Sequence, residues 1–163
     1  MKNKCGYNKK QLQLIRYFIK EINEEIVLRI SPAGEFSCNL PAYRLYLGNK
    51  KLKYQSALWE KWYRKQEFYC GDVNNRMIAL LHEIGHFETF NVDEWLLRND
   101  QVEVLLNQFY DKKISFEDLN YAYWDLTNEY KATQWAIEYY KKNKEKCDLL
   151  AQQIGYNYLI KNA

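Results

Sequence analysis

Both histidines of the chain lie in one short stretch, His82-Glu83-Ile84-Gly85-His86. Helix residues four positions apart lie on one face, so both imidazoles can bind a single zinc ion at Zn–N distances of roughly 2.0–2.1 Å. Glu83 would lie on an adjacent face, where it can reach a water on the metal without binding the metal itself. This H-E-x-x-H spacing predicts a zinc-dependent hydrolase. The alternative is a pair of ordinary helix histidines, one buried and one solvated.

A catalytic zinc usually has three protein ligands and an open fourth position for water. Val92 stands where the metzincin motif places a third histidine, so that class is excluded and the third ligand must be a carboxylate or, less favourably, a cysteine. Glu129 is the preferred ligand, because four residues bracket it at helical spacing and three of them are alanines. These residues are Ala122, Asp125, Ala132 and Ala136. Such a groove allows close approach of another helix, and a buried carboxylate requires a cation. Glu103 is the alternative ligand, and Glu129 could instead be a solvated or lysine-paired residue.

The predicted chemistry is metal-assisted hydrolysis, in which zinc lowers the pKa of a bound water toward about 7 and Glu83 acts as general base. The oxyanion needs a further donor, which must be a Tyr, Arg or Lys. Tyr123 and Tyr130 lie near Glu129 in sequence, but both fit the apolar stripe of their helix, so we expect them in the core. Asp125 could orient a ligand histidine, or could be an exposed helix carboxylate.

The motif helix is predicted to begin after an N-cap at Asp72 and to end near Phe90. Gly85 costs this helix up to about 1 kcal/mol relative to alanine. A glycine at this position therefore favours the close approach of another element beside the metal.

Three further helices are expected after the motif. The first runs from Asp93 to Tyr110, and its predicted inward residues are Trp95, Val102, Leu105 and Phe109. A capping box at Ser115–Asp118 opens the longest helix, which reaches about Lys142 and carries Glu129. The last helix is predicted at about 146–160.

The N-terminal part predicts a helix over 8–26 and three short strands over 26–30, 35–40 and 43–47. Turn-forming residues at 31–34 separate the first two strands. We expect a small, mostly antiparallel sheet of two to four strands. A substrate peptide could add to its edge at 43–47.

The segment 50–66 mixes basic and aromatic residues. It could be a nucleic-acid surface, on which aromatic rings stack on bases. An amphipathic helix is preferred, with Leu58, Trp59, Trp62, Tyr63 and Gln66 on one face, and with Lys61 and Lys65 on the other.

The composition indicates one globular domain over residues 1–163, with 47% hydrophobic residues and a net charge of +3 that is too small to indicate nucleic-acid binding. No signal peptide or membrane-spanning run is recognised, so a cytoplasmic protein is expected. The four cysteines contain no C-x-x-C pair and are expected to be reduced thiols. They are Cys5, Cys38, Cys70 and Cys147.

The sequence resembles the ImmA/IrrE-type zinc metallopeptidases, whose pattern is H-E-x-G-H followed by E-x-x-A-N-x-F-A on a later helix. The second pattern corresponds here to Glu129–Ala136. Thr133 stands where Asn is usual, and Trp135 stands where Phe is usual.

This resemblance implies an α+β, mainly helical zincin-like domain in which His82, His86 and Glu129 bind Zn²⁺ and Glu83 is catalytic. Members are often encoded on phages and mobile elements, where they cleave repressors, so a protein or peptide substrate such as a repressor is expected. An active zinc endopeptidase is the preferred function. The alternatives are a zinc-binding regulatory or interaction module with little turnover, and a nucleic-acid-binding protein.

Overall fold

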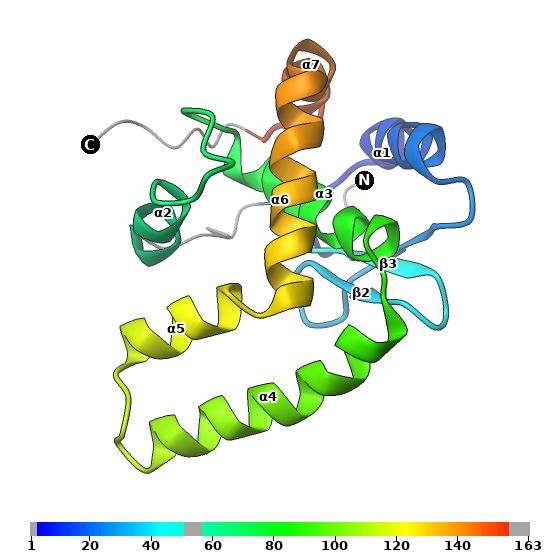
Figure 1. Ribbon diagram of the computed structural model, residues 1–163. Coiled ribbons are helices and arrows are strands. Elements are labelled where there is room, and N and C mark those ends of the chain that lie inside the picture. The colour runs from blue at the N-terminus through cyan, green and yellow to red at the C-terminus, as the bar shows by residue number, and fades with distance from the viewer. Residues whose placement is uncertain (1–2, 51–56, 157–163) are drawn as a thin grey trace.

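The computed structural model describes residues 3–50 and 57–156 (Figure 1). These residues form an α+β structure, mainly helical with a small sheet, as the sequence predicts. In chain order the elements are α1 (Lys9–Ile22), β1 (Val27–Ile30), β2 (Ser37–Asn39), β3 (Arg44–Leu47), α2 (Ala57–Tyr63), α3 (Asn75–Glu88), α4 (Val92–Tyr110), α5 (Phe116–Trp124), α6 (Thr127–Lys142) and α7 (Lys144–Ile154). The end of the predicted last helix, beyond residue 156, lies outside the described residues.

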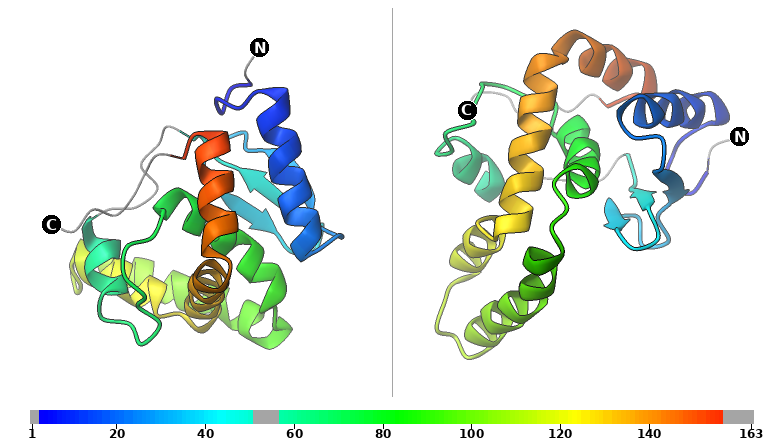
Figure 2. Two further views of the ribbon diagram at one scale, coloured as in Figure 1. Left: turned by 90° about the horizontal axis from the view of Figure 1, so that it is seen from above. Right: turned by 45° about the vertical axis from the view of Figure 1, so that its right-hand side comes forward.

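Helices α3 and α6 lie side by side at the centre of the molecule (Figures 1 and 2). Ten of the fourteen residues of α3 are buried, so other elements cover most of its circumference. At Gly85 the two backbones come so close that a Cβ would lie 2.6 Å from the carbonyl oxygen of Ala132. The close approach predicted from this glycine is therefore confirmed.

The boundaries of α3 differ from the prediction. Its N-cap is Asn74 and not Asp72, because the Asn74 side chain accepts the amide hydrogen of Met77 at 3.0 Å. Asp72 instead lies 3.9 Å from the guanidinium of Arg64. The helix ends at Glu88, two residues before the predicted end.

The sheet contains three strands in the order β1-β3-β2. Strand β3 pairs antiparallel with β2 but parallel with β1, so the prediction of a mostly antiparallel sheet is wrong for one of the two pairs. The predicted edge at 43–47 is also wrong, because β3 is the central strand and β2 is an edge strand. The helix predicted over 8–26 ends at Ile22, and it lies beside α7 (Figure 2).

Helices α4 and α5 form a hairpin that extends away from the rest of the molecule, and we call them the arm (Figure 1). Neither helix contains a fully buried residue. The four predicted inward residues of α4 are only half-buried. The capping box at Ser115 is confirmed, since the Ser115 and Asp118 side chains each accept the other residue's backbone amide hydrogen.

The predicted longest helix is two helices, because the chain leaves the helical path at Asp125 and Leu126. Asp125 caps the end of α5, and its carboxylate accepts a hydrogen bond from the indole of Trp62 at 2.8 Å. The break changes the chain direction between α5 and α6 (Figure 1), and α6 then packs along α3.

Candidate metal centre

The structure brings together the three residues predicted as zinc ligands. His82 and His86 lie one turn apart on α3, and Glu129 lies in the first turn of α6. The Oε2 atom of Glu129 is 3.2 Å from Nε2 of His82 and 3.4 Å from Nε2 of His86. Gly85 allows this arrangement, because it lets α6 approach α3 at Ala132, which lies on the helical turn after Glu129.

The Glu129 carboxylate is buried, with 3% of the residue exposed. Burial alone would raise its pKa, but hydrogen bonds and charge from His82 and His86 hold the pKa of Glu129 well below its usual range. Burial likewise opposes a charge on His82, yet Glu129 and Glu83 raise the pKa of His82 above 6.5. The site therefore holds a carboxylate that stays ionised and requires a proton on histidine or another cation.

The orientation of His82 is set by Thr133. The Nδ1 atom of His82 lies 3.0 Å from the Thr133 hydroxyl, which leaves Nε2 facing Glu129. The sequence suggested Asp125 as a residue that could orient a ligand histidine, but the Asp125 carboxylate accepts a hydrogen bond from Trp62 instead. Because α6 begins only at Thr127, the break before it separates Asp125 from the helix that carries Glu129.

Arg98 on α4 is a site residue that sequence reasoning missed. Its Nε donates to Oε1 of Glu129 at 2.9 Å, and its Nη2 donates to the Tyr123 hydroxyl at 2.8 Å. The guanidinium thus holds the Glu129 oxygen that does not face the histidines. One signal was present in the sequence, since Arg98 is the only Lys or Arg between Arg76 and Lys112.

The two tyrosines expected in the core differ in their surroundings. Tyr130 packs against the rings of Trp62 and Phe68, as predicted. Tyr123 instead lines the cleft in front of Glu129, so the prediction of core packing is wrong for it. Burial, with the nearby Glu129 charge, raises the pKa of Tyr123, so the phenol keeps its proton.

The cleft in front of the two histidines has a volume of about 870 Å³, and Glu83 lines it. Glu83 is 7% exposed, and one of its carboxylate oxygens lies within 4.8 Å of a ring nitrogen of His86. Glu103, the alternative third ligand, is exposed on α4 and belongs to neither group of potential metal ligands found among the described residues.

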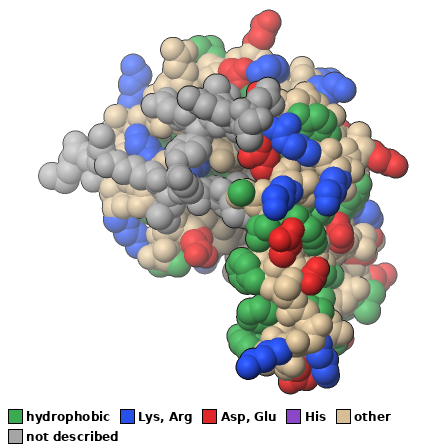
Figure 3. Space-filling model, turned by 90° about the vertical axis from the view of Figure 1, so that its left-hand side faces the viewer, with side chains coloured by type: hydrophobic (Ala, Val, Ile, Leu, Met, Phe, Trp, Pro, Cys, Tyr) green, Lys and Arg blue, Asp and Glu red, His purple; other side chains and the backbone are tan. Residues whose placement is uncertain are grey.

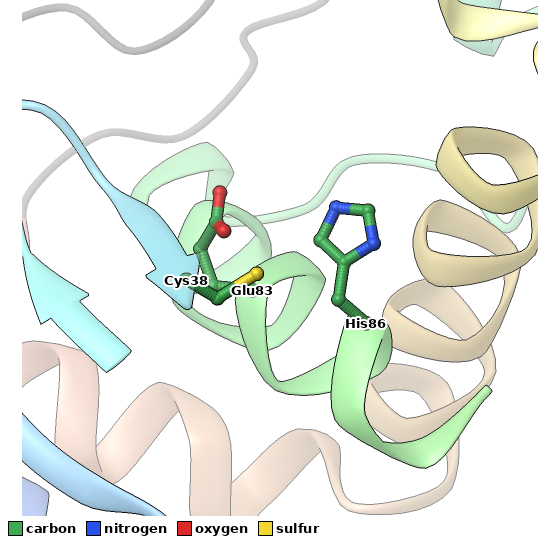
Figure 4. A group of neighbouring side chains, drawn as sticks. All are labelled: Cys38, Glu83 and His86. Carbon is green, nitrogen blue, oxygen red and sulfur yellow. The ribbon is translucent and has the colours of Figure 1, made fainter. Parts of the chain in front are cut away.

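A second group of potential metal ligands shares His86 with the first. It consists of Cys38, Glu83 and His86, whose ligand atoms all lie within 4.8 Å of one another (Figure 4). Burial and the negative charge of Glu83 raise the pKa of the Cys38 thiol. Sequence reasoning gave Cys38 no role beyond that of a reduced thiol, and all four cysteines are free, as predicted.

The described part of the basic and aromatic segment favours the amphipathic helix. Trp59, Trp62 and Tyr63 are buried in the core, where their rings cannot stack on bases, while Lys61 and Lys65 are exposed. Residues 51–56 of this segment lie outside the described residues.

Comparisons of the chain with protein-family models, curated proteins and solved structures found no match. A functional proposal for this chain therefore rests on the geometry around His82, His86 and Glu129. Within residues 3–50 and 57–156, no helix has the length and apolar character needed to cross a membrane.

Proposed function

We propose that the protein is a zinc-dependent metallopeptidase of the ImmA/IrrE type, with a zincin-like domain in which His82, His86 and Glu129 are the zinc ligands. The observation that supports this most directly is the position of one Glu129 oxygen, within 3.4 Å of the Nε2 atoms of both histidines. Two imidazoles and one carboxylate are a ligand set found in catalytic zinc sites.

The surroundings of the three residues also fit a metal ion. Thr133 occupies Nδ1 of His82, which leaves Nε2 available as a ligand. The carboxylate of Glu129 is buried and ionised, so a divalent cation would offset a charge that is costly to bury.

Zinc bound at this site would polarise a substrate carbonyl and lower the pKa of a water to about 7. Glu83 lines the same cleft, and its carboxylate would accept a proton from the attacking water and pass it to the leaving nitrogen. Arg98 and the protonated Tyr123 hydroxyl also border the cleft, and either would be a donor of the required type for the developing oxyanion.

The proposed substrate is a protein or peptide, with a repressor or another regulator as the class that the family resemblance implies. An extended peptide can bind by adding a strand to a sheet edge. The edge strand beside the cleft is β2, whose Ser37 and Cys38 line the cleft, and this strand replaces the 43–47 segment in the proposal.

The second candidate is a zinc-binding module with little turnover. The thiol of Cys38 beside His86 favours this candidate, because a further protein ligand would close the position that a catalytic zinc leaves open. Both candidates require zinc at the same residues, so turnover is what separates them.

The test combines zinc analysis of the purified protein with hydrolysis of a mixed peptide library. Glu83→Gln should keep one zinc per chain and lose hydrolysis, whereas Glu129→Gln should lose the zinc. Glu103→Gln, which changes an exposed glutamate on the arm, is the matched control and should keep both. Wild-type protein without zinc would contradict both candidates. Zinc without hydrolysis, both in the wild type and in Cys38→Ser, which lacks the thiol beside His86, would favour the module.

A further inference from the structure

We propose that Cys38 is a fourth protein ligand of the metal at His82, His86 and Glu129, so that the resting site is closed to water. This inference rests on the proposed function in one respect, namely that these three residues bind a metal. It goes beyond that function because it makes the resting protein latent.

The edge strand directs Cys38 toward the motif helix. Cys38 is paired with Leu45 of β3 in an antiparallel register, and residues that lie directly opposite in such a pair share one face of the sheet. Leu45 is completely buried, whereas the neighbours of Cys38 on β2, Ser37 and Asn39, are exposed. The thiol therefore lies on the inner face of the sheet, and Figure 4 shows its sulfur pointing toward His86.

The thiol lies between two openings that lead to the site. The cleft of about 870 Å³ and a smaller one of about 320 Å³ are both lined by Cys38, His86, Arg98 and Glu129. The sulfur is within 4.8 Å of a His86 ring nitrogen. A change of staggered rotamer moves the sulfur without moving β2. Cys38 is not grouped with His82 and Glu129 in its present position, so binding the same metal at a Zn–S distance of about 2.3 Å would require such a rotation.

The Cys38 thiol also lies beside the Glu83 carboxylate. Glu83 is 7% exposed, and one of its carboxylate oxygens lies within 4.8 Å of the Cys38 sulfur. A thiol must lose its proton to bind a metal, so binding of Cys38 would release one proton to the solvent. A fourth protein ligand would fill the position that a catalytic zinc keeps open for water, so hydrolysis would require the thiolate to leave first.

The test uses cobalt(II) in place of zinc, because a thiolate ligand gives cobalt a sulfur-to-metal charge-transfer band in the near ultraviolet. Wild-type protein should bind one cobalt and show this band. Cys38→Ser should still bind cobalt but lose the band. Its affinity should fall at least about 10-fold, since loss of a residue that only touches a ligand already costs about 10–100-fold.

Cys70→Ser is the matched control, because Cys70 is a half-buried free thiol that contacts Tyr63 and belongs to neither ligand group. It should leave the cobalt spectrum unchanged. One cobalt bound without the charge-transfer band, or a band that survives Cys38→Ser, would overturn this inference and leave the proposed function standing. Failure of the wild type to bind cobalt would overturn both.

A second measurement needs no variant. Iodoacetamide labelling of the full-length protein, followed by peptide mapping, should show that zinc slows alkylation of Cys38 but not of Cys70. Equal labelling rates of Cys38 with and without zinc would contradict a bond between its sulfur and the metal.

Discussion

The central pair of helices, α3 and α6, and the arm formed by α4 and α5 both contribute residues to the same site, but they differ in how deeply they are buried. Most of α3 is buried, and its backbone touches that of α6 at Gly85. The arm has no fully buried residue, and its surface shows apolar side chains along its length (Figure 3). These include Val92, Leu96, Leu97, Val104, Leu106, Tyr110 and Phe116, all more than a third exposed.

The two regions therefore have different roles in the proposed metal centre. His82, His86 and Glu129 belong to the central pair, whose close packing sets the distances between their side chains. The arm contributes Arg98, which donates to Glu129 from the side away from the histidines, and Tyr123, whose hydroxyl accepts a hydrogen bond from Arg98. We infer that the central pair determines whether a metal binds, whereas the arm adjusts how tightly it is held.

The largest expected difference between the regions is in stability. Leu80→Ala on α3 removes a completely buried side chain, and should lower the free energy of unfolding by about 2–5 kcal/mol. Leu97→Ala on α4 removes a side chain that is 57% exposed, and should change it by no more than about 0.5 kcal/mol. Urea denaturation of both variants measures the contrast, and equal losses would show that the arm is as well packed as the centre.

The central pair is also the part of the site that the sequence predicts best. The histidine spacing places both imidazoles on one face once the segment is a helix, and the alanines around Glu129 indicate a groove that another helix can enter. Gly85, on the other helix of the pair, indicated the same close contact between the two helices. These signals are local because each depends on the helical repeat alone.

Arg98 and Cys38 could not be found in the same way. Their positions relative to the histidines depend on how the arm and the edge strand are placed in three dimensions. The break at Asp125 was missed for a related reason, since it coincides with a hydrogen bond from Trp62, which is distant in sequence. The strand order was missed because strands of three or four residues carry little information on their partners.

A methyl group at the contact between the two central helices should have the next largest effect. Gly85→Ala places a Cβ 2.6 Å from the Ala132 carbonyl oxygen, so the helices must separate at a cost of about 1–3 kcal/mol. Zinc affinity should fall as well, because Glu129 moves with α6. Gly71→Ala is the control. The φ of +91° at Gly71 makes alanine unfavourable there, but a Cβ added at this position would have no atom within 4 Å. Stability should therefore fall without loss of zinc affinity. Unchanged zinc affinity in Gly85→Ala would show that the positions of the proposed ligands do not depend on this contact.

The contribution of the arm is tested by Arg98→Gln. This variant removes the guanidinium that binds Oε1 of Glu129, and should lower zinc affinity by about 10–100-fold with little loss of stability. Tyr123→Phe removes only the hydroxyl bound to Arg98 and should have a smaller effect. Competition with a chromogenic chelator measures both affinities. If Arg98→Gln binds zinc as tightly as the wild type, the arm does not influence zinc affinity.

Proton competition provides a test confined to the central pair. Burial disfavours a charge on His82, but Glu129 raises its pKa above 6.5, so below that raised pKa a proton must leave before a metal binds. Zinc affinity should therefore fall about tenfold per pH unit as the pH drops through this range. Chelator competition between pH 8 and pH 6 (chosen to bracket about 6.5, the ordinary pKa of histidine) measures the slope, and an affinity independent of pH would contradict the assignment of His82 as a ligand.

The smallest expected effect lies at the far end of the arm. The Ser115 hydroxyl accepts the amide hydrogen of Asp118 at 3.1 Å, so Ser115→Ala should cost about 1 kcal/mol through loss of this cap. Ser115→Thr keeps the cap and should cost less. The loss should appear as faster hydrogen exchange of α5 amides, while zinc affinity stays unchanged, because Ser115 precedes the first residue of α5 and Tyr123, which contacts Arg98, lies at the opposite end of the helix. A drop in zinc affinity with Ser115→Ala would mean that the arm and the central pair behave as one cooperative unit.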